Sequence, residues 1–363
     1  MSNFFWTNSD EDYKGWDRFL SATKRGHYLQ ISHWLKSHRV YGFKVDLLLI
    51  KDDNSQIIGG AGLIISKFGF FKFCIVNCGP IIKEGHEELF NPIVKEILSR
   101  CRLYKPISIS INFPILEKKN NNLSPFCLDI KLDDQIFKRS KKGSVINAVS
   151  SIDGFREVPI YYGDDIDSEI FLFNNFTKST RRDVRYSLKN NLNLEFAKSN
   201  EELEEAYMLL EQNAKNQNYS IRPWKDFKKT LVNMVKDKTC IVPTCRYKGV
   251  LKAALIVLNV GKRFTYLAGG SIREKPDLQV SRFLQFQILR LSIEKGYSFY
   301  DISVGGSKGV TKFKEGFGSK HRRFIGYRYW VERKTLFWIY IKFLPFLKRN
   351  KVFISKILKY FNK

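Results

Sequence analysis

The chain has 363 residues, of which 44% are hydrophobic and 15% aromatic, and it carries 62 Lys and Arg against 36 Asp and Glu. This length allows two domains, and the apolar content supports hydrophobic cores, which excludes a wholly disordered chain. The net charge of +26 predicts attraction to polyanions such as RNA, anionic lipid surfaces or phosphorylated substrates. Charge alone does not choose among these partners.

Cysteine usage and hydropathy predict the compartment. The six cysteines form no CxxC pattern, and no histidine lies near a cysteine pair at zinc-ligand spacing, so we expect no metal site. Their strand-like surroundings predict small buried side chains in a reducing environment. The first residues lack a signal-peptide pattern, and no apolar run approaches the roughly 18–20 residues that span a bilayer. We therefore expect a cytoplasmic protein, at most peripheral at the inner face of the membrane.

In chain order, the elements of the first half recur in the second. The first half predicts strands at 46–52, 56–66 and 73–79, a helix at 86–103 and a strand at 107–114. The second half predicts strands at 240–249, 250–260 and 264–271, a helix at 278–295 and a strand at 298–303. Gly59 and Gly249 are 190 residues apart, and Gly79 and Gly270 are 191 apart. A period of this length indicates duplicated domains rather than a solenoid.

Each half combines an antiparallel meander with a helix that crosses to another strand, so we expect an α/β or α+β fold. The predicted domains are 1–160 and 161–333, followed by a tail at 334–363. The polar segment 131–168 predicts a connecting loop and a pair of strands. Apolar periodicity predicts a further helix at 201–216, and Gly296 is expected to end the helix at 278–295.

The most informative segment is 299–318, FYDISVGGSKGVTKFKEGFG, which runs from a strand through a glycine turn into a basic helix. Gly305 and Gly306 expose backbone N–H groups, and Lys312 and Lys314 add positive charge. Together they suit a phosphorylated or diphosphate-bearing ligand. The alternative is a turn that requires positive φ, followed by a solvated basic helix. The first half has no such turn after its last strand, so we expect the site in the second half.

Several motifs resemble the Fem family of aminoacyltransferases, which build the peptidoglycan interpeptide bridge. They are QISHWLKSHRVYG (30–42), NCGPII (77–82), FTKSTRRDVRYSLKNNL (176–192), SIRPW (220–224), FTYLAGGS (264–271) and KFKEGFG (312–318). The similarity extends over roughly residues 28–330. It implies two tandem GNAT-like acyltransferase domains with mixed, largely antiparallel sheets and flanking helices.

The resemblance also implies an activity. It implies transfer of an aminoacyl or acyl group to an amine of a diphosphate-bearing cell-envelope precursor, such as a lipid- or nucleotide-linked muramyl peptide. Aminoacyl-tRNA would be the donor, and no cofactor would be tightly bound. The family's diphosphate-binding residues match Arg222, Tyr266 and Lys314, and its N-terminal phosphate-binding lysine matches Lys36. Alternatively, Arg222 caps a helix near Pro223, Tyr266 is a core residue and Lys36 is solvated.

Two departures and two other functions qualify this interpretation. Family members commonly carry an acid where this chain has Asn112, so a carboxylate role is not available there. Acyl-CoA-dependent relatives bind pyrophosphate with a glycine-rich turn, but 271–283 has no closely spaced glycines, which favours aminoacyl-tRNA. An acyl-CoA-dependent N-acyltransferase acting on a nucleotide- or lipid-linked sugar of surface polysaccharides stays an alternative. So does a non-catalytic RNA-binding protein.

For the chemistry, we expect Lys314 to neutralise charge near the reacting centre or to hold acceptor phosphate. Asp301 is the best carboxylate candidate for orienting the attacking amine, and its alternative role is to cap the turn. Backbone N–H groups at a strand irregularity near 268–270 would hold the carbonyl oxygen in an aminoacyl transfer.

Two basic segments are candidates for polyanion binding. The predicted helix at 177–190 carries five basic residues, which suit either RNA phosphates or a solvated face. From Arg333 to the last residue the sequence contains nine basic residues and no acid, and Pro345 is expected to separate two helices. These amphipathic helices either lie in an anionic membrane surface or dock on the body of the protein.

Overall fold

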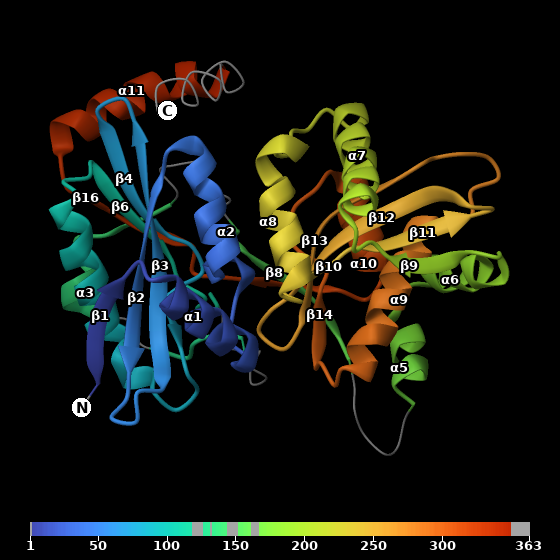
Figure 1. The fold of residues 1–363 in the computed structure, drawn as a ribbon, viewed down its shortest axis with the longest axis horizontal. Helices are drawn as coiled ribbons and strands as arrows, with labels where there is room; N and C mark the ends of the chain where they lie inside the picture. Colours follow the sequence, from blue (N-terminus) through green and yellow to red (C-terminus); the bar gives the residue numbers. More distant parts are fainter. Residues whose placement is uncertain (1, 118–125, 131–132, 144–151, 161–166, 350–363) are drawn as a thin grey trace. The chain divides into compact units, whose positions relative to one another are not determined.

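The computed structural model describes residues 2–117, 126–130, 133–143, 152–160 and 167–349 (Figure 1). The chain forms two compact units. Unit 1 combines residues 1–154 with 323–363, and unit 2 comprises residues 155–322. These limits differ from the expected domains 1–160 and 161–333, because the chain returns to unit 1 after residue 322. The tail therefore belongs to unit 1 as well.

Unit 1 is built on a mixed sheet whose strand order is β1-β2-β3-β4-β6-β16-β7, with β5 beside β3. Its strands are β1 (Asn3–Thr7), β2 (Lys44–Lys51), β3 (Ile57–Phe68), β4 (Phe71–Val76), β5 (Ile81–Ile82), β6 (Ser108–Asn112), β7 (Lys141–Lys142) and β16 (Tyr327–Val331). Its helices are α1 (Asp10–Ala22), η1 (Tyr28–Gln30), α2 (Ser32–Lys36), η2 (Ser37–Tyr41), η3 (Glu87–Leu89), α3 (Phe90–Leu103), α4 (Asp134–Phe137) and α11 (Lys334–Arg349).

Unit 2 has a second mixed sheet, ordered β9-β11-β12-β13-β14-β8-β15, with β10 beside β12. Its strands are β8 (Gly154–Pro159), β9 (Asn193–Phe196), β10 (Cys240–Ile241), β11 (Pro243–Tyr247), β12 (Val250–Asn259), β13 (Phe264–Ser271), β14 (Phe299–Asp301) and β15 (Lys320–Arg323). Its helices are α5 (Ser168–Asn175), α6 (Lys178–Lys189), α7 (Asn200–Asn216), α8 (Trp224–Lys236), α9 (Val280–Glu294) and α10 (Lys308–Gly316).

The two sheets have the same topology, which confirms the duplication predicted from the sequence. In both, three consecutive strands pair antiparallel, β2-β3-β4 in unit 1 and β11-β12-β13 in unit 2. The third strand of each then pairs parallel with a strand that follows a crossover helix, β4 with β6 and β13 with β14. The predicted α/β class is confirmed, with each meander extended by one parallel connection.

One strand of each sheet comes from outside its own repeat. Strand β8 lies at the start of unit 2, long before the repeated strands β11–β14, yet it pairs with β14, while β16 follows unit 2 and pairs with β6. The two strands expected within 131–168 are present, but the prediction that they pair with each other is wrong. Strand β7 pairs with β16, and β8 pairs with β14. Each of these strands pairs with a strand far away in the sequence, and no local sequence pattern indicates such a partner.

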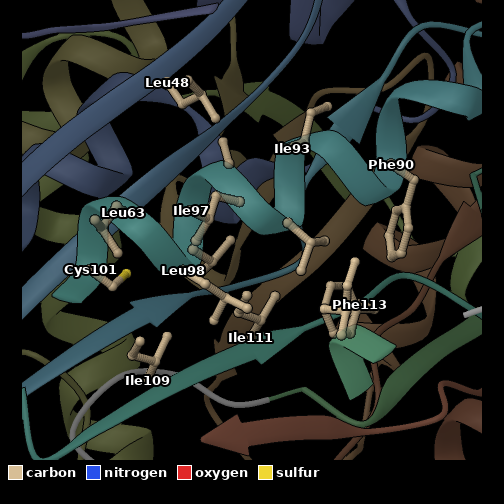
Figure 2. Close-up of a cluster of buried hydrophobic side chains, with 14 of the residues drawn as sticks. Leu48, Leu63, Phe90, Ile93, Ile97, Leu98, Cys101, Ile109, Ile111 and Phe113 are labelled. Carbon is tan, nitrogen blue, oxygen red and sulfur yellow. The ribbon is translucent and has the colours of Figure 1, made fainter. Parts of the chain in front are cut away.

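Strand β3 shows how unit 1 packs both faces of its sheet. Ala61 and Leu63 face the core that α3 covers, where Ile93, Ile97 and Leu98 of the helix interdigitate with Ile109 and Ile111 of β6 (Figure 2). The alternate residues Gly60 and Gly62 face the other side of the sheet. A Cβ at Gly62 would lie 2.3 Å from Leu35 of α2, so glycine is what permits this helix to approach the sheet.

Unit 2 repeats the arrangement with larger side chains. Helix α9 covers one face through Phe283, Phe286 and Leu289, which pack with Leu255 and Val257 of β12. Helix α7 covers the other face, where a Cβ at Gly270 would lie 2.9 Å from the backbone oxygen of Leu209. The predicted helices at 201–216 and 278–295 are confirmed as α7 and α9. Gly296 follows the end of α9, as predicted, with φ 68°. Both sheets are thus covered by helices on their two faces.

Candidate active site

The parallel pair at the centre of unit 2 ends early. Strands β13 and β14 pair only at Phe264 with Tyr300 and at Thr265 with Asp301. Strand β13 continues to Ser271 and carries a bulge, because Val257 pairs with Tyr266 while the preceding Ile256 pairs with Ala268. The ladder therefore skips Leu267, next to the expected irregularity at 268–270. Residues 266–269 are half-buried, whereas Phe264 and Thr265, which pair with β14, are buried.

The glycine turn lies directly after β14. Ser303, Gly305 and Gly306 all have positive φ, of 61°, 87° and 113°. A Cβ at Gly306 would also lie 2.6 Å from Cγ1 of Val310, so glycine is required there by space as well as by conformation. The hydroxyl of Ser307 then accepts from the Val310 N–H and begins α10. The turn and the basic helix predicted from the sequence are therefore both present.

Lys314 projects from α10 under this turn and is only 3% exposed. Its Nζ donates to the carbonyl oxygen of Ser303 at 3.2 Å, to the Ser303 hydroxyl at 3.0 Å and to the Gly305 carbonyl oxygen at 3.1 Å. The same ammonium lies 5.5 Å from the ring centroid of Tyr266 on β13. Lys314 thus connects the glycine turn to the bulged strand, and it holds the turn rather than extending into solvent.

Asp301 lies on the opposite side of the same turn and is 4% exposed. Its Oδ1 accepts from the backbone N–H of Ser303 at 2.8 Å and from that of Arg156, on β8, at 3.2 Å. The side chain of Arg156 contacts Ser319 and Glu315 around α10. Asp301 therefore makes the turn-capping contacts that were weighed for it, and it positions Ser303 and β8.

Burial has the largest effect on the pKa values of Lys314 and Asp301. It lowers the pKa of Lys314 to about 8, against the attraction of Asp301, and Arg156 lowers that pKa further. Burial also raises the pKa of Asp301, which Arg263, two backbone hydrogen bonds and Lys314 oppose. Desolvation therefore shifts both pKa values towards the neutral forms, because the opposite charges do not fully replace the lost water. A lysine with a pKa near neutrality and a raised carboxyl pKa are typical of catalytic sites.

Two predicted residues lie in unit 2 outside this cluster. Lys312 is exposed on α10, and it carries its charge beside the glycine turn. Arg222 lies just before α8, but the N-cap residue is Pro223, so Arg222 does not have the capping role of the alternative. The carbonyl oxygen of Arg222 accepts from the Tyr207 hydroxyl at 2.7 Å, and its guanidinium lies 5.7 Å from the Phe227 ring.

Sequence reasoning missed the polar contacts between α7 and the bulged strand. The Asn213 side chain donates to the Gly269 carbonyl oxygen at 3.4 Å and to the Tyr219 hydroxyl at 3.0 Å. Tyr219 is 46% exposed, in the segment that leads to Arg222. These contacts place the 217–223 segment beside residues 266–269. The asparagine carried no sequence signal because it lies within an ordinary amphipathic helix.

Lys36 belongs to unit 1 and is engaged there. Its Nζ lies 2.7 Å from Oδ1 of Asp10 and 3.9 Å from the ring centroid of Tyr13. The structure therefore gives Lys36 an acidic and an aromatic partner, whereas the two expectations were a phosphate contact and a solvated side chain.

The corresponding position of unit 1 is filled by the chain itself. The buried amide of Gln30 joins two strands, accepting from the Gly62 N–H at 2.6 Å and donating to the Asn77 carbonyl oxygen. The Tyr327 hydroxyl donates to Oδ1 of Asn77 at 2.7 Å, and Asn112 donates to the Ile152 carbonyl oxygen at 2.9 Å. These side chains occupy the end of β4 and β6, so the glycine turn of unit 2 has no counterpart at this position of unit 1.

A cavity elsewhere in unit 1 is a weaker candidate. It is lined by Asn8, Arg39, Phe43, Lys44, Val45 and Asp46. Its buried carboxylate, Asp46, already forms an ion pair with Arg100 at 2.9 Å and accepts from the Tyr104 hydroxyl. The carboxylate is therefore fully engaged in holding α3 to the sheet.

The basic helix α6 is also partly engaged. Arg181 donates to the carbonyl oxygen of Phe173, Arg182 pairs with Asp183, and Arg185 lies 5.5 Å from the Phe173 ring centroid. The contacts of Arg181 and Arg185 tie the helix to α5, and all three contacts reduce the charge that the helix offers to RNA.

Comparisons with solved structures agree with this architecture. FemX superposes with a TM-score of 0.75 at 14% identity, covering 93% of this chain and 99% of that one. L-PGS from Bacillus licheniformis gives 0.53 at 12% identity, covering 94% and 97%. A conserved protein of unknown function from Bacteroides thetaiotaomicron gives 0.55 at 10% identity, covering 91% and 99%. At these identities the likeness concerns the fold.

Family models reach further than the fold. An acetyltransferase (GNAT) domain matches residues 175–315, which contain the bulged strand, the glycine turn and Lys314. The FemAB family model matches residues 12–242, more than half of the chain. No curated protein matches. The chain is therefore an acyltransferase that belongs to the FemAB family.

Proposed function

We propose that this acyltransferase moves an aminoacyl group from aminoacyl-tRNA to an amine of a diphosphate-bearing cell-envelope precursor, such as a muramyl-peptide intermediate. The observation that carries the proposal is the buried Lys314, which lies between the glycine turn and the bulged strand β13. A positive charge in a desolvated place beside free backbone groups is what an acyl-transfer transition state requires.

The segment between β13 and α9 supports aminoacyl-tRNA over acyl-CoA. A CoA pyrophosphate would need N–H groups at the start of this helix. Here Asp277 Oδ1 accepts from the N–H of Gln279, the N-cap residue of α9, at 2.8 Å, so a carboxylate lies beside the helix start. Glu274 of the same segment pairs with Lys252 at 2.9 Å. Two acidic side chains in place of closely spaced glycines disfavour a bound pyrophosphate.

The proposed chemistry needs no resident cofactor. The acceptor amine attacks the ester carbonyl of the aminoacyl-tRNA, and an amide C–N bond forms as the ester C–O bond breaks. The amine proton passes to the departing ribose hydroxyl. Backbone groups at the Leu267 bulge hold the carbonyl oxygen, and the Lys314 charge stabilises the tetrahedral oxyanion. Asp301 acts as a positioning residue, because it fixes Ser303, which supplies two of the three Lys314 acceptors.

The acceptor's phosphates are proposed to lie beside the glycine turn. Gly305 and Gly306 are exposed and carry no side chains, and Lys312 is exposed on the adjoining helix. Arg222 adds a guanidinium from the segment next to the bulged strand. This combination of N–H groups, ammonium and guanidinium suits a diphosphate.

The test follows a labelled aminoacyl group. Purified protein is incubated with a nucleotide-linked muramyl peptide and either aminoacyl-tRNA labelled in its amino acid or labelled acetyl-CoA. We expect label in the peptide only from aminoacyl-tRNA. Transfer should be lost in Lys314→Met, whereas Lys312→Met should weaken transfer only at low acceptor concentration, because Lys312 is proposed to contact the acceptor's phosphates. Transfer from acetyl-CoA alone would replace the proposal with the acyl-CoA alternative.

A further inference from the structure

Helix α11 of unit 1 is apolar on two sides. One side packs on the sheet, where the Tyr340 ring centroid lies 5.6 Å from that of Phe71 and 4.8 Å from that of Phe73. Phe337 stacks on Tyr329 of β16. These contacts show that the described part of the tail docks on the body of unit 1, which was one of the two expected arrangements.

Helix α11 also runs through Pro345 to Arg349, so the expected break at Pro345 is wrong. Pro345 is exposed, where water can replace the missing backbone donor.

The remaining surface of α11 has no cover within the described residues: Trp338 lies on the side turned away from Tyr340, and Ile341 and Phe343 lie on the two flanks of the helix. Trp338 is 62% exposed, and Ile341 and Phe343 are 41% and 56% exposed. Lys342 lies over the Trp338 ring at 5.5 Å from its centroid. A helix already docked through Tyr340 gains nothing in folding from these large exposed side chains. Their exposure indicates a surface that meets something apolar.

The β3–β4 hairpin extends this surface. Phe70, at the tip of the hairpin, is 70% exposed. Its ring centroid lies 4.4 Å from that of Phe71, whose ring contacts Tyr340. Lys67 and Lys72 are exposed on the same hairpin and pair directly across it. Two like charges in a cross-strand pair destabilise a hairpin unless an anion lies beside them. The hairpin therefore combines an exposed aromatic residue with a pair of lysines.

We propose that this surface, defined as Phe70, Trp338, Ile341 and Phe343 with Lys67, Lys72, Lys334 and Lys342, binds the face of an anionic lipid bilayer. The aromatic rings would lie at the boundary of headgroups and acyl chains, and the lysines would contact lipid phosphates. The protein would lie on the bilayer rather than cross it, because no described helix is long and apolar enough to span one.

Charge favours a bilayer over a second copy of this chain. From Arg333 onward the sequence contains nine basic residues and no acid. A symmetric dimer through this surface would bring the same basic groups of two copies together, and like charges would oppose it. An anionic bilayer instead offers apolar depth and negative charge at once.

The test uses the full chain, because deleting the tail would also remove Tyr340 from the core. Vesicles of phosphatidylcholine with 30% phosphatidylglycerol are floated with the protein at about 0.05 and 0.5 M salt, and neutral phosphatidylcholine vesicles run in parallel. We expect binding to anionic vesicles that weakens with salt, and a blue shift of tryptophan emission that Trp338→Ser abolishes. Lys342→Glu should lower binding roughly tenfold.

Matched controls are available on exposed positions elsewhere. Leu103→Ser changes an apolar side chain that is 71% exposed, and Lys229→Glu reverses an exposed charge; both should bind like the unchanged protein. Equal binding to neutral vesicles, or binding that Trp338→Ser and Phe70→Ser leave unchanged, would overturn the proposal. So would a dimer in gel filtration that Trp338→Ser dissociates. The vesicle assay needs no donor or acceptor, so its result is separate from the test of the proposed function.

Discussion

Asp301 and Lys314 hold the two sides of one residue, Ser303. The carboxylate of Asp301 accepts from the Ser303 N–H, while the ammonium of Lys314 donates to the Ser303 carbonyl and hydroxyl oxygens. Ser303 has φ 61°, a left-handed conformation that costs free energy for any residue with a Cβ. Two buried, oppositely charged groups thus keep an unfavourable turn in place beside the bulged strand. Maintained strain of this kind is typical of functional sites.

Replacing Lys314 with Met should remove most of the activity. The substitution keeps an unbranched apolar side chain and removes the charge, so turnover should fall by roughly 100-fold or more. Lys312→Met, two residues away and exposed, should keep kcat within a few-fold and raise the KM for the acceptor, because Lys312 is proposed to bind its phosphates. Steady-state aminoacyl transfer measures both. The free energy of unfolding near pH 7 should change much less than turnover, because the three lost hydrogen bonds to the turn are offset by the removal of a desolvated charge. Normal turnover in folded Lys314→Met would remove this lysine from the site.

The pH dependence of stability should report the buried lysine. The pKa of Lys314 is about 8 in the folded protein and near 10.5 when unfolded. Between these values the unfolded chain binds more protons, so the unfolding free energy rises with pH across this window. Relative to Lys314→Met, the protein should gain up to about 3 kcal/mol from pH 8 to pH 10.5. Urea unfolding of both proteins at each pH measures the difference, which would stay constant if the folded pKa were 10.5.

Replacing the glycines of the turn with alanine should lower the stability of the protein by amounts that follow a predictable order. Gly306→Ala meets both a positive φ and Val310, whereas Gly305→Ala meets only the φ because no atom lies within 4 Å of its added Cβ. We expect a loss of about 1 kcal/mol for Gly305→Ala and clearly more for Gly306→Ala. Gly309→Ala lies inside α10, where an added Cβ would meet only the Ser307 hydroxyl oxygen at an ordinary 3.9 Å, and should be neutral or slightly stabilising. Thermal unfolding of the three variants checks the order; equal losses at 305 and 306 would contradict the close contact with Val310.

Substitutions on the docked and on the exposed side of α11 should have different effects on the free energy of unfolding. Tyr340→Ala leaves a hole against Phe71 and Phe73 and should cost about 2–4 kcal/mol. Trp338→Ala removes a side chain that is 62% exposed and should change stability by less than about 0.5 kcal/mol. Urea unfolding of both variants measures this. A large loss in Trp338→Ala would mean that this side chain is also a structural contact.

Local patterns predicted most of the elements. Apolar periodicity located α7 and α9, and continuous apolar runs located β3 and β12, because these signals need only neighbouring residues. The long separation between matching landmarks predicted two similar sheets. The segment 299–318 also predicted its own turn and helix, since the glycines there are required by backbone conformation.

Tertiary structure alone decided the rest. Nothing local indicates that β8 pairs with β14 or β16 with β6, because strand partners are chosen by whichever sheet edge is left open. For the same reason the expected domain limits missed the return of the chain to unit 1. Lys314 was expected to extend towards ligand, yet it is buried, because the oxygens of Ser303 and Gly305 converge on it only after the turn forms. Composition determines which groups carry charge, and folding determines which of those groups lose their water.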